Sequence, residues 1–194
     1  MSGSKQKWLK VAGLCGVIGP LIVLSFILVS ISRSPGFSFT ENALSDLGAQ
    51  EPSATSFNSG LIIGGVIIGV FALGLWWSLR GKALGNVGGL MLLLAAVALC
   101  AIGIFTENAG DIHLYVSYAF FGLLVISLWI IGAALVQLRE KMLGLLLIIA
   151  GLFAAAVWAL YPVWPALALP ETISALAAFA CLIILGVRML KRAD

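Results

Sequence analysis

The sequence predicts an all-α integral membrane protein, a bundle of six transmembrane helices. Of its 194 residues, 62% are hydrophobic and only 10% are charged, whereas soluble domains carry about 25% charged residues. Six apolar stretches have the length of about 20 residues that a helix needs to cross a hydrocarbon core of about 30 Å. The connections between them are short, so we expect residues 1–194 to form a single transmembrane domain.

The first apolar stretch follows a basic leader that contains Lys5, Lys7 and Lys10. The stretch is longer than the core of a signal peptide and lacks a small-residue cleavage site, so we expect it to be retained as a membrane helix. The helices are predicted at about 11–32, 57–79, 86–106, 114–137, 143–161 and 170–190.

Charge divides unequally between the two ends of this bundle. An even number of helices puts both termini on one side, and 10 of the 11 basic residues fall there, while only Arg33 falls on the other side. The positive-inside rule therefore predicts cytoplasmic termini and a multi-pass protein of the cell membrane. Because this rule accounts for the basic residues, nucleic acid is not an expected partner. Membrane lipid is expected, and the sequence identifies no protein partner.

Small residues in the second helix indicate how it packs. Ser56, Gly60 and Gly64 repeat every four residues, and Gly65 and Gly69 do the same on an adjacent stripe. Helices in lipid associate through close backbone approach at small residues. The two stripes predict a helix that is contacted by neighbours on two sides.

A five-residue repeat favours an internal duplication. The sequence Phe-Thr-Glu-Asn-Ala occurs at 39–43 and again at 105–109, each time after an outward-running helix and before an inward-running one. The residues that follow the two copies do not align in register. Duplicated hairpins would be related by an axis along the membrane normal, with the two copies side by side at the outer face.

Three motifs link the chain to a known family. These are N-x-L-S-D-L-G at 42–48, F-N-x-G at 57–60, and an acidic segment with a histidine at 107–113. With these motifs the chain resembles, over nearly its whole length, an archaeal and bacterial multi-pass membrane family numbered 998 among domains of unknown function. The resemblance implies membrane location and topology but supplies no reaction.

Polar residues of the two outer loops form the candidate site. Ser38 and Glu41 have the spacing of a capping box, which predicts a short helix over 39–47. On that helix Asn42 and Asp46 lie one turn apart, as do Glu41 and Ser45. The candidate site comprises eight residues: Glu41, Asn42, Ser45, Asp46, Asn58, Glu107, Asp111 and His113.

These residues are compatible with three kinds of chemistry. The favoured role is a structural clasp in which His113 pairs with Asp46 across the two loops. A metal site from Glu41, Asp46, Asp111 and His113 would have to be an oxygen-rich site, because zinc sites use several His or Cys ligands. A hydrolase would need Ser45 or Ser59 beside His113 and an aspartate, and no motif supports that arrangement.

Function is less constrained than fold. The sequence favours a structural module, or one that binds a lipid or a membrane partner at a polar outer-face site. The alternative is a membrane enzyme that acts on a lipid or isoprenoid head group at the outer leaflet. No cofactor is expected, because Cys15, Cys100 and Cys181 are widely spaced and His113 is the only histidine. Pumps and light sensors are disfavoured, since no charged residue lies near the centre of a predicted helix.

Overall fold

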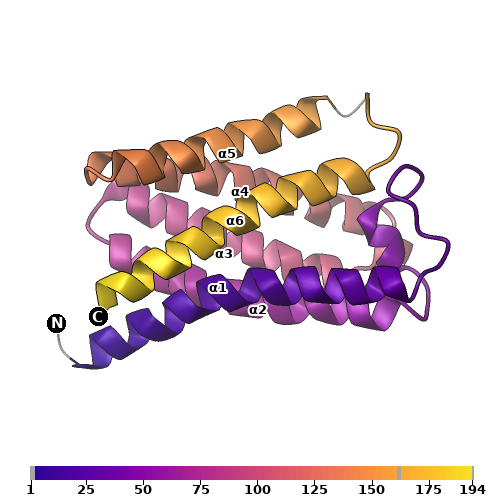
Figure 1. The fold of residues 1–194 in the computed structure, drawn as a ribbon, viewed down its shortest axis with the longest axis horizontal. Helices are drawn as coiled ribbons and strands as arrows, with labels where there is room; N and C mark the ends of the chain where they lie inside the picture. Colours follow the sequence, from indigo (N-terminus) through magenta and orange to yellow (C-terminus); the bar gives the residue numbers. More distant parts are fainter. Residues whose placement is uncertain (1–2, 161–162, 194) are drawn as a thin grey trace.

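The computed structural model describes residues 3–160 and 163–193 and consists of six long helices lying side by side (Figure 1). All six are long and apolar enough to cross a membrane, which confirms the predicted class, and the described residues contain no β-strand. The long helices are α1 (Gly3–Ser32), α2 (Ala54–Leu79), α3 (Ala83–Ile104), α4 (Asp111–Gln137), α5 (Lys141–Ala159) and α6 (Ala168–Ala193).

Nearly all observed helix ends lie within three residues of the predicted ones. The exception is the start of α1, at Gly3 rather than residue 11. Lysine and glutamine are good helix formers, so the helix continues through the basic leader beyond its apolar part. The predicted end of the fifth helix, residue 161, lies outside the described residues, and α5 ends at Ala159.

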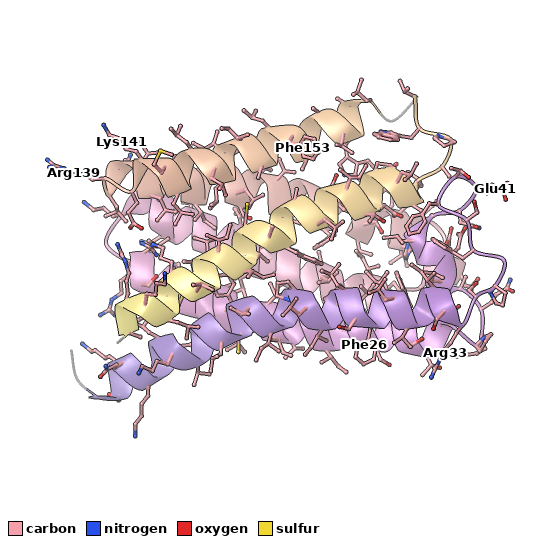
Figure 2. The ribbon with its side chains drawn as sticks, viewed as in Figure 1. Phe26, Arg33, Glu41, Arg139, Lys141 and Phe153 are labelled. Atoms are coloured by element: carbon pink, nitrogen blue, oxygen red, sulfur yellow. The ribbon has the colours of Figure 1, made fainter. Side chains whose placement is uncertain are left out.

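The two ends of the bundle differ in charge. The basic end carries the start of α1, the end of α6 and the loops at 80–82 and 138–140. The acidic end carries the loops at 33–53 and 105–110 and residues 163–167 (Figure 1). Figure 2 shows Arg139 and Lys141 at the basic end and Glu41 and Arg33 at the acidic end. The division by charge is the one that the sequence predicts, whereas the orientation in the membrane remains a prediction.

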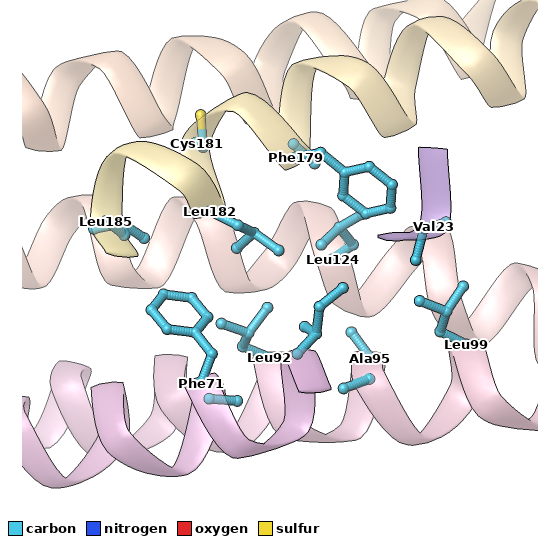
Figure 3. Close-up of a cluster of buried hydrophobic side chains, with 14 of the residues drawn as sticks. Val23, Phe71, Leu92, Ala95, Leu99, Leu124, Phe179, Cys181, Leu182 and Leu185 are labelled. Carbon is cyan, nitrogen blue, oxygen red and sulfur yellow. The ribbon is translucent and has the colours of Figure 1, made fainter. Parts of the chain in front are cut away.

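Helices that follow one another in sequence pack against one another, and α6 closes the arrangement by packing on α1. Helix α5 lies at one edge of the bundle, against α4 and α6, while α6 crosses the bundle obliquely (Figure 1). Few contacts join α4 directly to α6. The core between the helices is filled by buried apolar side chains such as Phe71, Leu92 and Phe179 (Figure 3).

Both glycine stripes of α2 lie against a neighbouring helix, as predicted. Gly60 and Gly64 face Phe26 and Val23 of α1, and there is no room for a Cβ atom at either glycine. Gly65, on the second stripe, faces Cys100 of α3, where a Cβ would lie 2.5 Å from its sulfur. Helix α2 therefore packs closely against both α1 and α3.

The first acidic-end loop contains less helix than predicted. Residues 39–41 form turns, and only Leu44–Gly48 is helical, as a 3₁₀ segment labelled η1. The expected capping box is absent because Asn42, rather than Glu41, reaches back, its Oδ1 accepting from the Ser38 N–H at 2.9 Å. A second 3₁₀ segment, η2 (Glu107–Ala109), precedes α4. The two copies of the repeat thus differ in backbone form, and the duplication remains a prediction.

Candidate functional site

The polar residues of the first loop are organised around Asp46. Its Oδ2 atom accepts hydrogen bonds from Asn42 Nδ2 at 2.8 Å and from the backbone N–H of Ala43 at 3.1 Å. The pairing of Asn42 with Asp46 is the one predicted from their spacing, although a turn and a 3₁₀ segment produce it. These bonds fix the Asp46 carboxylate at the start of η1.

Glu107 of η2 lies against this carboxylate. Burial raises the pKa of the Glu107 carboxyl above its ordinary value, and the neighbouring Asp46 raises it further, while the Ser45 hydroxyl partly offsets the shift. The Oε2 atom of Glu107 is buried and has no well-formed hydrogen bond. The two loops therefore meet at two neighbouring carboxyl groups, and the surroundings of Glu107 favour its protonated form.

The last helix completes the first loop. Glu171, in the first turn of α6, accepts a hydrogen bond on Oε2 from the Leu44 N–H at 2.7 Å. One turn earlier along the chain, the Ala168 N–H donates to the carbonyl oxygen of Asn42 at 2.9 Å. The sequence did not indicate this contact, which joins residues 127 positions apart.

Two asparagine amides hold the end of the first loop. Asn58 of α2 donates from Nδ2 to the carbonyl oxygen of Gly48 at 3.0 Å, and Asn108 of η2 donates to that of Ala49 at 2.9 Å. Gly48 is the last residue of η1, and Ala49 is the residue after it. Asn58, a predicted site residue, therefore holds the end of the first loop from α2, and Asn108 holds it from η2.

His113 has different partners from those predicted. Its Nδ1 lies 2.8 Å from the carbonyl oxygen of Phe105, and its Nε2 lies 3.4 Å from the hydroxyl of Ser117, one turn further along α4. No ion pair joins His113 to Asp46, although both residues are described. The expected clasp is therefore wrong, because the histidine side chain is held by the carbonyl that follows α3 and by its own helix.

The predicted site residues separate into three groups. Asn42, Ser45, Asp46 and Glu107 come together, with Asn58 supporting them; His113 is buried within a different set of contacts. Glu41 and Asp111 are exposed. Among the described residues, no group of three or more His, Cys, Asp or Glu side chains is placed to hold a metal ion.

A polar basin of about 560 Å³ opens above the carboxyl pair. Asp46 and Glu107 line it together with Arg33, Glu51 and Asn108. Arg33 is exposed, and no carboxylate of the described residues lies within ion-pair distance of it. The basin thus combines one unpaired guanidinium with several acidic groups.

Arg33 also borders a second hollow. A groove of about 360 Å³ runs between α1 and α2 and is lined by Arg33, Phe26, Val29 and the small polar residues Ser25, Thr55, Ser56 and Ser59. Figure 2 shows Phe26 and Arg33 along the same edge of the bundle. Both helices are long and apolar enough to cross a membrane, and Arg33 lines both this groove and the basin.

A small cavity of about 50 Å³ lies inside the bundle beneath η1. Its walls are apolar apart from Ser45, Ser117 and Glu171, and they include Val23, Leu99 and Phe179, which lie close together in the core (Figure 3). The η1 segment separates the basin from this cavity, because Asp46 lines the one while Leu44 and Ser45 line the other.

Comparison with known proteins identifies the family. A family model described as "Protein of unknown function (DUF998)" matches residues 17–188. The chain belongs to this family. The match confirms the resemblance carried by the three sequence motifs. It runs from within α1 to within α6, so it covers α2 to α5 in full and includes the residues that line both hollows of the acidic end. No curated protein and no solved structure matches the chain.

Proposed function

We propose that this DUF998 protein binds a membrane phospholipid at its acidic end. The observation that carries the proposal is the position of Arg33, which lines both the polar basin and the groove between α1 and α2. A phospholipid has the matching form, with a charged head group in water and acyl chains in the membrane. Arginine binds phosphate by two parallel hydrogen bonds, which suits a residue at this junction.

The charges of the basin favour a zwitterionic head group. Asp46, Glu51 and Glu107 lie in the same basin as Arg33. These acids would repel a head group that is purely anionic, whereas a head group with an ammonium beside its phosphate would satisfy both kinds of charge. Phosphatidylethanolamine has this chemistry, with a primary amine that donates hydrogen bonds to carboxylates.

The groove is suited to one acyl chain. Phe26 and Val29 supply apolar surface, while Ser25 and Ser59 are small enough to leave space. The positive-inside rule places the acidic end outside, so the lipid would come from the outer leaflet. A bound lipid would then neutralise charges on the loops and stabilise the protein.

Thermal unfolding in detergent micelles with added lipid tests the proposal. Phosphatidylethanolamine should raise the Tm of the wild type more than phosphatidylglycerol does, and Arg33→Gln should abolish most of the difference. Arg80→Gln is the matched control, because Arg80 is an exposed arginine at the basic end, where it lies over the Trp77 ring. Equal shifts with both lipids, unchanged in Arg33→Gln, would contradict the proposal.

A second candidate function is the membrane enzyme that the sequence left open. A separate observation favours it: Ser117, which lines the small cavity beneath η1, lies beside His113.

A further inference from the structure

The contacts of His113 are those of a general base. The Phe105 carbonyl oxygen can only accept a hydrogen bond, so Nδ1 of His113 is the nitrogen that carries the proton in this 2.8 Å contact. In the neutral ring, Nε2 is then left as an acceptor. Nε2 faces the Ser117 hydroxyl at 3.4 Å, a length common for catalytic hydrogen bonds without substrate.

The serine of this pair lines an apolar cavity. Ser117 belongs to the wall of the 50 Å³ cavity beneath η1, which it shares with Phe120, Phe121 and other apolar side chains. One water needs about 10–15 Å³ of such space. The cavity therefore has room for an ester group but not for a whole lipid, whose chains would have to extend beyond it.

A second groove reaches the same wall from the membrane side. It has a volume of about 410 Å³ and lies between α4 and α5, lined by Tyr118, Phe121, Trp129, Trp158 and smaller residues. Phe121 lines both this groove and the central cavity. Its ring also packs on Trp158, with the centroids 4.8 Å apart. Phe121 is thus the side chain that the groove between α4 and α5 shares with the cavity lined by Ser117.

The depth of Ser117 matches that of a lipid ester. Ser117 comes six residues after Asp111, where the 27-residue α4 begins, and so lies about 9 Å along a helix of about 40 Å. If a hydrocarbon core of about 30 Å is centred on this helix, its edge lies about 5 Å from the helix start. The hydroxyl then lies just inside the boundary where acyl chains join the glycerol.

We propose that Ser117 and His113 form a nucleophile and general base that cleave the acyl ester of a membrane lipid entering between α4 and α5. His113 Nε2 takes the hydroxyl proton as Ser117 Oγ attacks the ester carbonyl carbon. The bond from that carbon to the alcohol oxygen breaks, and the departing alcohol takes the proton from His113. Water then attacks the acyl-serine, giving up a proton to His113 that returns to Ser117 as the fatty acid leaves.

This site is separate from the lipid site proposed above. The basin and the α1–α2 groove hold a lipid through Arg33, whereas the cleavage site is reached past Phe121 on another face of the bundle. The two proposals therefore fail independently. Loss of the lipid-dependent shift in Tm concerns only the first, and loss of serine reactivity concerns only the second.

Labelling of the full-length protein in micelles with a fluorescent alkyl fluorophosphonate tests the cleavage site. Ser117 should attack phosphorus and displace fluoride, and peptide mass mapping of the wild type should place the adduct on Ser117. Ser117→Ala should lose the label, and His113→Gln should slow labelling about 100-fold. Ser78→Ala, which changes an exposed serine at the basic end, is the matched control and should be labelled like the wild type.

Phe121→Ala provides an independent readout of the entry route. If Phe121 closes the path from the membrane, this variant should be labelled several-fold faster by a long-chain fluorophosphonate than the wild type. Mapping of the wild-type adduct does not depend on the folding of any variant. A folded wild type that stays unlabelled, or that carries the label on another residue, overturns the proposal.

Discussion

Glu140 accepts two hydrogen bonds from Arg188, from Nε at 2.6 Å and from Nη2 at 2.5 Å. Glu140 lies in the loop between α4 and α5, and Arg188 lies near the end of α6, so the pair joins α6 to this loop at the basic end. Arg192 donates to the same carboxylate at 2.7 Å. The Arg188 side chain is only 9% exposed, so its buried positive charge needs the Glu140 carboxylate as a counter-charge.

Replacing the carboxylate should therefore be costly. We expect Glu140→Gln to destabilise the protein by about 3 kcal/mol, because the buried Arg188 guanidinium loses its counter-charge. The measurement is thermal unfolding in detergent at neutral pH. Glu41→Gln, at an exposed glutamate of the acidic end, is the control and should leave the Tm nearly unchanged. Equal Tm values for the two variants would show that the pair contributes nothing to stability.

The same carboxylate predicts a loss of stability in acid. The hydrogen bonds from Arg188 hold the pKa of Glu140 below its ordinary value. A depressed pKa contributes stability that is present above the unfolded value of about 4.3 and is lost as pH falls through the folded value. The Tm difference between wild type and Glu140→Gln should therefore shrink as the pH is lowered from 5 towards 3. A difference that is constant over this range would contradict the assignment.

Glu107 predicts the opposite pH dependence. Burial and the neighbouring Asp46 raise the pKa of Glu107, so ionisation in the folded state costs stability as pH rises above about 4.3. Glu107→Gln keeps the shape and removes that cost, and we expect it to raise the Tm at pH 8 by about 2 °C. The gain should vanish at pH 4, where the wild-type carboxyl is protonated. A variant less stable than wild type at both pH values would argue against the repulsive pair.

The close packing of α2 on α1 leaves no space for a side chain at Gly64. A Cβ on Gly64 would overlap Val23 of α1, whereas a Cβ on Gly122 of α4 meets nothing within 4 Å. We expect Gly64→Ala to destabilise the bundle by about 1–3 kcal/mol through overpacking. Gly122→Ala should be neutral or stabilising, because alanine is the better helix former. Thermal unfolding of the two variants compares the same chemical change at a packed and an open site.

Orientation is tested by labelling single cysteines in intact cells. In a chain whose three native cysteines are replaced, Lys82→Cys should react with a membrane-impermeant maleimide only after the cells are opened. Glu41→Cys should react from outside, because the positive-inside rule puts the acidic end there. Both positions are exposed, so access depends only on the side of the membrane. Labelling of position 82 from outside would reverse the topology.

Most of the fold was predictable because a bilayer allows few solutions. Backbone polar groups in lipid must be paired within a helix, so hydropathy alone predicts the spans. The stripes of Gly60 with Gly64 and of Gly65 with Gly69 also indicated correctly that α2 has two neighbours. The start of α1 was misjudged, because hydropathy marks where a helix enters lipid and not where it begins.

The candidate site was predictable only in part. Asn42 and Asp46 are four residues apart, so local spacing was enough to predict their contact. The Leu44–Glu171 bond spans 127 positions and depends on the path of α6, which no local pattern contains. His113 was assigned to an aspartate on charge alone, yet a backbone carbonyl, which leaves no trace in the sequence, is its closest partner. Ser117 lies four residues after His113 and so on the same helix face, and this spacing is the sequence signal that could have indicated the pair.

The bond from Leu44 to Glu171 has a consequence for how the protein is made. A chain is synthesised from its N-terminus, so the first loop is made long before Glu171. Until α6 arrives, the Leu44 N–H and the Asn42 carbonyl lack the partners that they have in the finished bundle. A segment translated late thus closes a loop translated early, and a chain cut short before α6 would present an open first loop to quality-control proteases.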